Sequence, residues 1–336
     1  MSAVYWMVKN RYFPPQEITT PLNGKVYLIT GGMGGLGLET TRSLARRGAT
    51  VLCGVRSLAR GQSALDELEA FDPSLAGRVH LFKLDLASFA ATREGAERAK
   101  KLVEKMGGKL DGLINNAARL TAPYEIGADG FELSPQTNYL SPVLFTELLL
   151  PNLENTAAQS GSDVRIVWVA SNAGMVAPAD WDFVDASSFD NKCTKPGKDV
   201  NEFWSSFSRY GVSKMLPTVY IDDLQKRLRN KGSSILAISL NPGGVKTEKT
   251  VGMPFPLGLI ARLFFLPPSS ATFTSLFALT SPAVRAREEH FGGKYLEPFD
   301  RLEEVPGPKK LSDEETRERL RRVTRESLRV QGVEMQ

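Results

Sequence analysis

The stretch "KVYLITGGMGGLGLETTRSLARRGATVLCGV", residues 25–55, decides the fold of this chain. Its apolar run at 26–30 predicts a strand, which enters a glycine-rich turn, "TGGMGGLG" at 30–37. A helical pattern of apolar residues follows and ends at Gly48, and the apolar run at 50–55 predicts a second strand. A strand, a helix and a strand in this order form a β-α-β unit, which requires a parallel sheet and a right-handed crossover.

The same alternation continues along the chain. Further strands are predicted where apolar residues run almost without a break: "RVHLFKLDL" (78–86), "LDGLINNAA" (110–118), "VRIVWVAS" (164–171), "SILAISLNPGG" (234–244) and "GGKYLEP" (292–298). Helical patterns lie between these strands, and one of them starts near Tyr210 and runs to about Asn230. The pattern predicts an α/β protein with a Rossmann-type, doubly wound, mostly parallel seven-stranded sheet and helices on both faces.

We expect a single domain with additions at both ends. An N-terminal extension (1–21) precedes the domain (22–300), and a charged helical tail (301–336) follows it. Within the domain we expect an insertion at about 172–208 and a lid-like segment at about 248–270. The tail opens with Ser312 and Glu315 in a capping-box pattern, which predicts a solvated or docking helix. Pro217 should kink the helix that starts near Tyr210.

The composition excludes several classes of protein. With 336 residues, 42% hydrophobic content and a net charge of +4, the chain is an ordinary globular protein without a basic stripe for nucleic acid. Two cysteines and two histidines leave no disulfide framework and no expected metal site. The apolar stretch at 255–266 is shorter than the roughly 20 residues of a spanning helix. We expect a cytoplasmic protein, and a peripheral membrane contact through this stretch or the aromatic N-terminus stays open.

The glycine-rich turn has the context of a phosphate site, because it follows a strand and opens a helix. Glycines allow the backbone to approach a pyrophosphate, and the helix N-terminus offers unpaired N–H groups to the anion. An NAD-binding fold usually carries an acidic residue about 20 residues further on, to hold the ribose 2′-hydroxyl. Here that position, 19 residues after Gly37, is Arg56, and Arg60 follows. Guanidinium groups pair with a 2′-phosphate, so the expected cofactor is NADP(H).

An ordered set of motifs resembles the short-chain dehydrogenase/reductase superfamily over residues 22–300. The motifs are "TGGMGGLG" (30–37), "LDL" (84–86), "NNAA" (115–118), "TNYL" (137–140), "VAS" (169–171), "YGVSK" (210–214) and "NPGGVKT" (241–247). The resemblance implies an enzyme that transfers a hydride between a nicotinamide and a carbonyl or alcohol. It implies four catalytic residues: Ser171, Tyr210, Lys214 and Asn138.

These four residues have distinct implied roles. Tyr210 is the acid/base, and Lys214, one helical turn further on, should favour the phenolate and lower the pKa of Tyr210. Ser171 would donate a hydrogen bond to the substrate oxygen. Lys214 would also hold the ribose hydroxyls, and Asn138 would hold a water that links Lys214 to solvent.

The resemblance also implies the cofactor-binding residues. Besides Tyr210 and Lys214, they are Gly31, Gly35, Leu36, Gly37, Arg56, Arg60, Asp85, Leu86, Asn115, Pro242, Gly243, Val245 and Thr247. Asp85 and Leu86 would border the adenine, and Asn115 would lie along the adenosine. The residues from Pro242 onward would approach the nicotinamide amide and the phosphates.

The chain departs from the family pattern in the 39 residues that separate Ser171 from Tyr210. This insertion resembles the retinol-dehydrogenase-like branch and similar fungal reductases. It contains six aromatic residues: Trp181, Phe183, Phe189, Phe203, Trp204 and Phe207. Together with the segment at 251–268, they indicate either a lid over a pocket for a lipophilic or aromatic substrate or, alternatively, rings that only attach a long loop to the body.

Three functions stay open from the sequence. The first is an NADPH-dependent carbonyl reductase or alcohol dehydrogenase, with a role in specialised-metabolite biosynthesis suggested by the fungal resemblance. The second is a non-catalytic NADP-binding sensor or scaffold, and the third a membrane-surface retinol-, sterol- or lipid-type dehydrogenase. The resemblance implies a homodimer or homotetramer.

Overall fold

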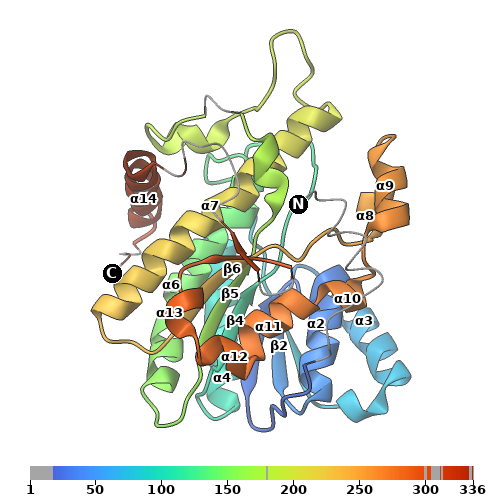
Figure 1. Ribbon diagram of the computed structural model, residues 1–336, viewed down its shortest axis with the longest axis vertical. Coiled ribbons are helices and arrows are strands. Elements are labelled where there is room, and N and C mark those ends of the chain that lie inside the picture. Colours follow the sequence, from blue (N-terminus) through green and yellow to red (C-terminus); the bar gives the residue numbers. More distant parts are fainter. Residues whose placement is uncertain are drawn as a thin grey trace.

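The computed structural model describes residues 18–178, 181–298, 301–303, 311, 313–332 and 335. The N-terminal extension expected over 1–21 therefore lies almost wholly outside the described residues, as does Ser312. The described residues place one sheet at the centre, with helices in front of it and behind it (Figure 1).

The described strands form one sheet in the order β3-β2-β1-β4-β5-β6-β7-β8. Their bounds are β1 Val26–Thr30, β2 Thr50–Val55, β3 Val79–Lys83, β4 Gly112–Asn115, β5 Arg165–Val169, β6 Leu236–Leu240, β7 Tyr295–Glu297 and β8 Arg301–Glu303. The first seven pair in parallel, which confirms the predicted doubly wound sheet. The short strand β8 pairs antiparallel to β7 and was not predicted. Strand order reverses between β1 and β4, so their carboxyl ends flank the crevice where such sheets bind ligands.

Helices cover both faces because the strands are apolar on both sides. On one face lie α4 Phe89–Lys105, α6 Ser141–Ala157 and α7 Phe203–Asn230. On the other lie α2 Gly35–Arg46, α3 Leu58–Phe71, α11 Phe273–Thr280, α12 Pro282–Arg285 and α13 Glu288–Phe291. None of the helices in the described residues combines the length and the apolar character needed to cross a membrane.

Helix α7 begins earlier than expected. It starts at Phe203 rather than near Tyr210, so the last residues of the expected insertion are its first turns. The part of the insertion that precedes α7 divides into a first limb, residues 172–190, and a second limb, residues 191–202. Helix α7 continues through the buried Pro217 to Asn230, so the proline does not end it, and the kink stays a prediction.

The C-terminal helix α14, Glu314–Arg329, packs on the body instead of standing in solvent. Its Leu320, Val323 and Leu328 belong to the same core as α6 and α7, and Figure 1 shows it alongside α7. Its N-cap is Asp313, which accepts the N–H of Thr316, and not Ser312 as the sequence pattern suggested. The amphipathic spacing of its leucines and valine explains the docking.

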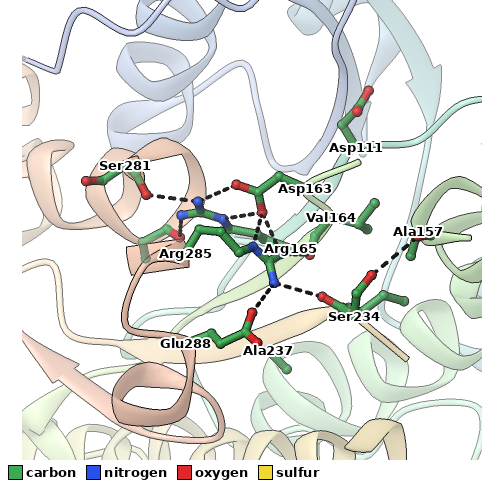
Figure 2. A network of polar contacts seen from close by, with 12 residues as sticks. Asp111, Ala157, Asp163, Val164, Arg165, Ser234, Ala237, Ser281, Arg285 and Glu288 are labelled. Atoms are coloured by element: carbon green, nitrogen blue, oxygen red, sulfur yellow. Dashed lines mark hydrogen bonds and ion pairs between the residues drawn. The ribbon is translucent and has the colours of Figure 1, made fainter. Parts of the chain in front are cut away.

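An arginine–aspartate network holds α11 and α12 to the amino end of β5 (Figure 2). Arg165 is fully buried and donates to the carboxylate of Asp163 and to the carbonyls of Ala278 (2.8 Å) and Ser281 (2.9 Å). Arg285 donates to the same carboxylate at 2.6 and 2.9 Å. Burial opposes ionisation of Asp163, but the two guanidinium groups hold its pKa below the usual range.

Candidate active site

The glycine-rich turn at the end of β1 is shaped for a close approach of its backbone. Gly31 and Gly35 have left-handed φ angles of +67° and +51°. A Cβ on Gly37 would lie 2.2 Å from the carbonyl oxygen of Gly31, so only glycine fits there. Helix α2 begins after Gly34, which provides no side-chain cap, and its first turn carries no acidic residue. The backbone N–H groups at the start of α2, where Leu36 is half-buried, therefore suit a pyrophosphate.

Asn116 holds this turn to the end of β4, a role that we did not predict. Its amide nitrogen donates to the carbonyls of Thr30 (3.0 Å) and Gly31 (3.3 Å), while the Thr30 hydroxyl accepts the backbone N–H of Asn116. The predicted cofactor residue Asn115 points away instead. It is 2% exposed and donates to the hydroxyl of Thr146 at 2.8 Å. Only backbone atoms of Asn115 are therefore left for contact with an adenosine.

Arg56 and Arg60 lie at the end of β2 and in the first turn of α3, and both are exposed. Within the described part of the chain, neither guanidinium forms an ion pair with a carboxylate. Ser57 caps α3 by accepting the N–H of Arg60 at 3.4 Å. Two unengaged guanidinium groups at this position suit a 2′-phosphate.

The two residues expected at the adenine differ in exposure. Asp85 is half-buried, and its carboxylate accepts the N–H of Ala87 at 3.0 Å. Leu86 is 5% exposed and belongs to the core, so its side chain offers little surface to a ligand.

Ser171 and Tyr210 come together although 39 residues separate them in the sequence. The Ser171 side chain lies close enough to the Tyr210 phenol to lower its pKa, and the Ser171 hydroxyl accepts the N–H of Ala173 at 3.1 Å. Ser171 is the N-cap of a short 3-10 helix, Asn172–Val176, which packs on α7. A Cβ on Gly211 would lie 2.3 Å from the carbonyl oxygen of Ala173, so the glycine after Tyr210 permits this close packing.

Lys214, one helical turn after Tyr210 on α7, is 2% exposed, and its ammonium donates to the carbonyl of Val169. Burial lowers the pKa of Lys214 to about 7. Burial also raises the pKa of Tyr210 to about 12, against the hydrogen bond from Ser171, which lowers it. In the chain alone the pKa of Tyr210 is therefore raised, because desolvation of the phenolate dominates, and the expected effect of Lys214 on it stays a prediction.

Asn138 lies in a π-helical turn, Gln136–Leu140, just before α6. Its side-chain oxygen accepts the N–H of Arg119 (2.6 Å), and its amide nitrogen donates to the carbonyl of Arg119 (3.1 Å) and the hydroxyl of Ser213 (2.8 Å). Ser213 donates in turn to the carbonyl of Tyr210 at 2.8 Å. The side chain thus links the loop after β4 to the helix that carries Tyr210, which leaves the backbone of Asn138 for the expected water.

The loop after β6 closes the site on the other side. The side chain of Asn241 accepts the N–H of Gly243 at 3.0 Å, and a Cβ on Gly35 would lie 4.0 Å from the methyl group of Thr247. The loop therefore faces the glycine-rich turn and places Pro242, Gly243, Val245 and Thr247 along the crevice. Thr247 also caps α8 Glu248–Val251, the start of the expected lid-like segment, which continues through α9 Leu257–Phe264 and α10 Pro268–Ala271.

The six aromatic residues of the insertion divide into two groups. Trp181, Phe183 and Phe189 are at most 7% exposed and pack in the core with Tyr139, so they attach the first limb to the body. Phe203, Trp204 and Phe207 form a ladder in the first turns of α7. The rings of Phe203 and Phe207 stack at 5.6 Å, and that of Phe207 stacks on Tyr210 at 6.2 Å. The interpretation that the rings attach a long loop to the body is confirmed for the first three, and the lid over a substrate pocket stays a prediction for the other three.

A doubly wound sheet with a glycine-rich turn and a Ser-Tyr-Lys set at its carboxyl edge defines an oxidoreductase of the nicotinamide-binding type. The family model for short chain dehydrogenases matches residues 25–187. A short chain dehydrogenase/reductase of Colletotrichum higginsianum is 34% identical over 290 residues, which are 86% of this chain and 71% of that protein. A short-chain dehydrogenase/reductase of Aspergillus calidoustus is 33% identical over 322 residues, 92% of this chain and 95% of that protein. The chain belongs to the short-chain dehydrogenase/reductase family.

Solved structures agree on the fold. A short chain dehydrogenase from Shigella flexneri complexed with NADP has a TM-score of 0.59 and 20% identity, covering 83% of this chain and 99% of that chain. A 3-ketoacyl-(acyl-carrier-protein) reductase from Brucella melitensis complexed with NADH has a TM-score of 0.56 and 20% identity, covering 82% of this chain and 97% of that chain. Both cofactors thus occur on this fold.

Proposed function

We propose that the protein is an NADPH-dependent reductase of the carbonyl group of a lipophilic or aromatic small molecule. The observation that carries the proposal is that Ser171 lies next to Tyr210, with the buried Lys214 one helical turn further along α7. This set lies at the same edge of the sheet as the glycine-rich turn.

The residues present fit a nicotinamide dinucleotide. Positions 31–37 form a cradle that a Cβ would fill, and Arg56 and Arg60 would hold a 2′-phosphate. When bound, the cofactor supplies the hydride.

The protein's own residues handle the proton. Ser171 donates a hydrogen bond to the substrate oxygen, which stabilises the developing negative charge. Tyr210 is neutral at pH 7, as an ordinary phenol is, and burial raises its pKa further to about 12; it gives its proton to that oxygen. Lys214 holds the ribose and brings positive charge to the phenolate that is left. Tyr210→Phe should therefore abolish turnover and leave NADPH binding intact, and substantial residual activity would show that another group is the acid.

Arg56 supports NADPH over NADH, and cofactor titration tests this part. Arg56→Glu should weaken NADPH binding by about tenfold to a hundredfold, since a charge-assisted hydrogen bond contributes about 1.5–3 kcal/mol. NADH binding should change little. Lys101→Glu, an equal charge reversal at an exposed position of α4, is the matched control. Equal losses for both nucleotides, or NADH-favoured binding by the wild type, would refute the assignment.

The aromatic ladder supports a lipophilic or aromatic substrate, because its stacked rings end on Tyr210. The fungal relatives support a role in specialised-metabolite biosynthesis. The cytoplasm is the proposed compartment. The complete Ser-Tyr-Lys set speaks against a non-catalytic NADP-binding sensor or scaffold.

One observation favours the membrane-surface dehydrogenase as a second candidate. Helix α9 and the residues beside it expose Phe255 (85%), Leu259 (48%) and Leu263 (50%). Such an apolar patch suits contact with a lipid surface. Co-sedimentation with liposomes tests it, and protein that stays wholly in the supernatant would count against this candidate.

A homodimer or homotetramer remains the proposed assembly. Ion pairs from Arg317 and Arg321 hold α14 over Asp222 and Asp223 of α7. A contact between two copies through the α7 surface around Asp222 and Asp223 would therefore include α14. Light scattering of the purified protein measures the assembly directly, and a monomer would refute it.

A further inference from the structure

Arg209 precedes Tyr210 and is one of the largest fully enclosed side chains, 2% exposed. Its Nη1 donates to the carbonyls of Lys192 (3.0 Å) and Val200 (2.7 Å), and its Nη2 donates to the carbonyl of Ala122 (3.1 Å). Nη2 also donates to the hydroxyl of Ser206 at 3.2 Å. One guanidinium thus joins α7 to both ends of the second limb and to the loop after β4.

Tyr124 completes the same junction from the side of the loop after β4. Its ring lies 5.6 Å from the guanidinium carbon of Arg209, and its backbone N–H donates to the side chain of Asn201 at 2.7 Å. Its hydroxyl donates to the carboxylate of Asp190. The loop after β4 and the insertion are therefore hydrogen-bonded to each other directly as well as through Arg209.

Glu132 supplies the facing negative charge. Its carboxylate is 0% exposed and lies 3.9 Å from Nε of Arg209, a nitrogen that has no hydrogen-bond partner within the described residues. The carboxylate instead accepts the N–H and the hydroxyl of Ser134. The contact is therefore an ion pair without a direct hydrogen bond. The geometry of Arg209 is set by the three carbonyls, not by the carboxylate.

The segments that meet at Arg209 belong to the substrate side of the site. The loop after β4 is tied at Arg119 to Asn138, and the second limb leads directly into the aromatic ladder of α7. Neither segment includes the glycine-rich turn or the arginines expected at the 2′-phosphate. A change at this junction should therefore move the substrate walls while the cofactor surface stays in place.

We propose that Arg209 is a positioning residue that holds the second limb and the loop after β4 against α7, and thereby sets the substrate side of the active site. The proposal rests on the reductase function proposed above. Arginine is needed because its planar fork of N–H groups reaches carbonyls in three directions. A lysine keeps the charge opposite Glu132 but offers a single nitrogen, so it cannot reach all three.

Arg165 provides a matched control. It is equally buried, and it also donates to two backbone carbonyls and faces a carboxylate, but it lies at the amino end of β5 (Figure 2). Arg165→Lys should therefore lower stability in a similar way without a change at the substrate side. Comparing Arg165→Lys with Arg209→Lys therefore separates a general loss of stability from a displacement of the second limb.

The test compares wild type, Arg209→Lys and Arg165→Lys by two readouts. The first is tryptic cleavage after Lys192 and Lys198, two exposed lysines of the second limb, followed by mass spectrometry. The second is reduction of benzaldehyde with NADPH, together with NADPH binding. Arg209→Lys should be cleaved about tenfold faster, with KM for the aldehyde raised about tenfold, and with kcat and NADPH affinity changed by less than about threefold. Arg165→Lys should change neither cleavage nor KM.

Three results would overturn the proposal. Unchanged cleavage of Arg209→Lys shows that the second limb is held by other contacts. Faster cleavage with an unchanged KM shows that the limb does not set the substrate side, and the same changes in Arg165→Lys show a general loss of stability. If the wild type reduces no carbonyl compound, the proposed function fails, and the cleavage comparison still decides whether Arg209 holds the limb.

Discussion

Replacing Lys214 by methionine should stabilise the protein while it abolishes turnover. Lys214 is 2% exposed, and burial lowers its pKa from 10.5 to about 7. At about 1.4 kcal/mol per pKa unit, this difference costs the folded protein up to about 5 kcal/mol at neutral pH. Methionine fills a similar volume without a charge. It loses the hydrogen bond to the Val169 carbonyl, which offsets roughly 1 kcal/mol of the gain.

The pH dependence of this gain follows from the direction of the shift. The unfolded chain protonates Lys214 below pH 10.5, whereas the folded protein does so only below about 7. Between these values the unfolded state binds more protons, so the stability of the wild type rises with pH. The advantage of Lys214→Met is therefore largest at pH 7 and below. It should shrink by about 2 kcal/mol between pH 7 and pH 9.

Urea unfolding without cofactor at several pH values between 6 and 9 measures the effect. The matched control is Lys226→Met, a lysine of the same helix whose side chain is 54% exposed. Its difference from the wild type should stay flat with pH. A Lys214→Met protein that is less stable than the wild type throughout, or whose advantage does not change with pH, would refute the reasoning.

Three further outcomes are expected. Asp163→Asn should lower the free energy of unfolding by about 2–3 kcal/mol, because it leaves the buried Arg165 without its carboxylate, and kcat should be unchanged. Gly37→Ala should abolish NADPH binding in a titration, because its Cβ would lie 2.2 Å from the Gly31 oxygen; binding within about threefold of wild type would contradict the shape of the turn. Leu320→Ala should cost about 2–5 kcal/mol in urea unfolding, and a cost near zero would mean that α14 does not dock in solution.

The sheet, and the place of Ser171, Tyr210 and Lys214 at its carboxyl edge, could be predicted because both depend on local patterns. The apolar runs, the glycine-rich turn and the spacing of Tyr210 and Lys214 each fix a local conformation, and parallel strands bring their carboxyl ends to one edge. The start of α7 was missed because Phe203 to Phe207 were counted as part of an irregular insertion. Aromatic residues at helical spacing were the available signal.

The remaining features depend on contacts between distant segments. Neighbouring residues at the end of a strand face opposite sides, and the sequence does not show which of them faces the glycine-rich turn. It therefore could not show that Asn116, and not Asn115, points toward that turn. The pKa of Tyr210 depends on how deeply the folded chain buries the phenol, which spacing alone does not reveal. The burial of Arg209 could not be predicted for the same reason, because its hydrogen-bond partners lie up to 87 residues away in the sequence.

The aromatic attachment of the first limb bears on how the protein opens. Trp181, Phe183 and Phe189 share one core with Trp168 of β5 and with Tyr139, whose hydroxyl meets Thr324 of α14. A segment built into the core in this way cannot detach without exposing those rings. Its amide hydrogens should therefore exchange with solvent at the pace of the central strands, whereas the second limb, held mainly by one side chain, should exchange first.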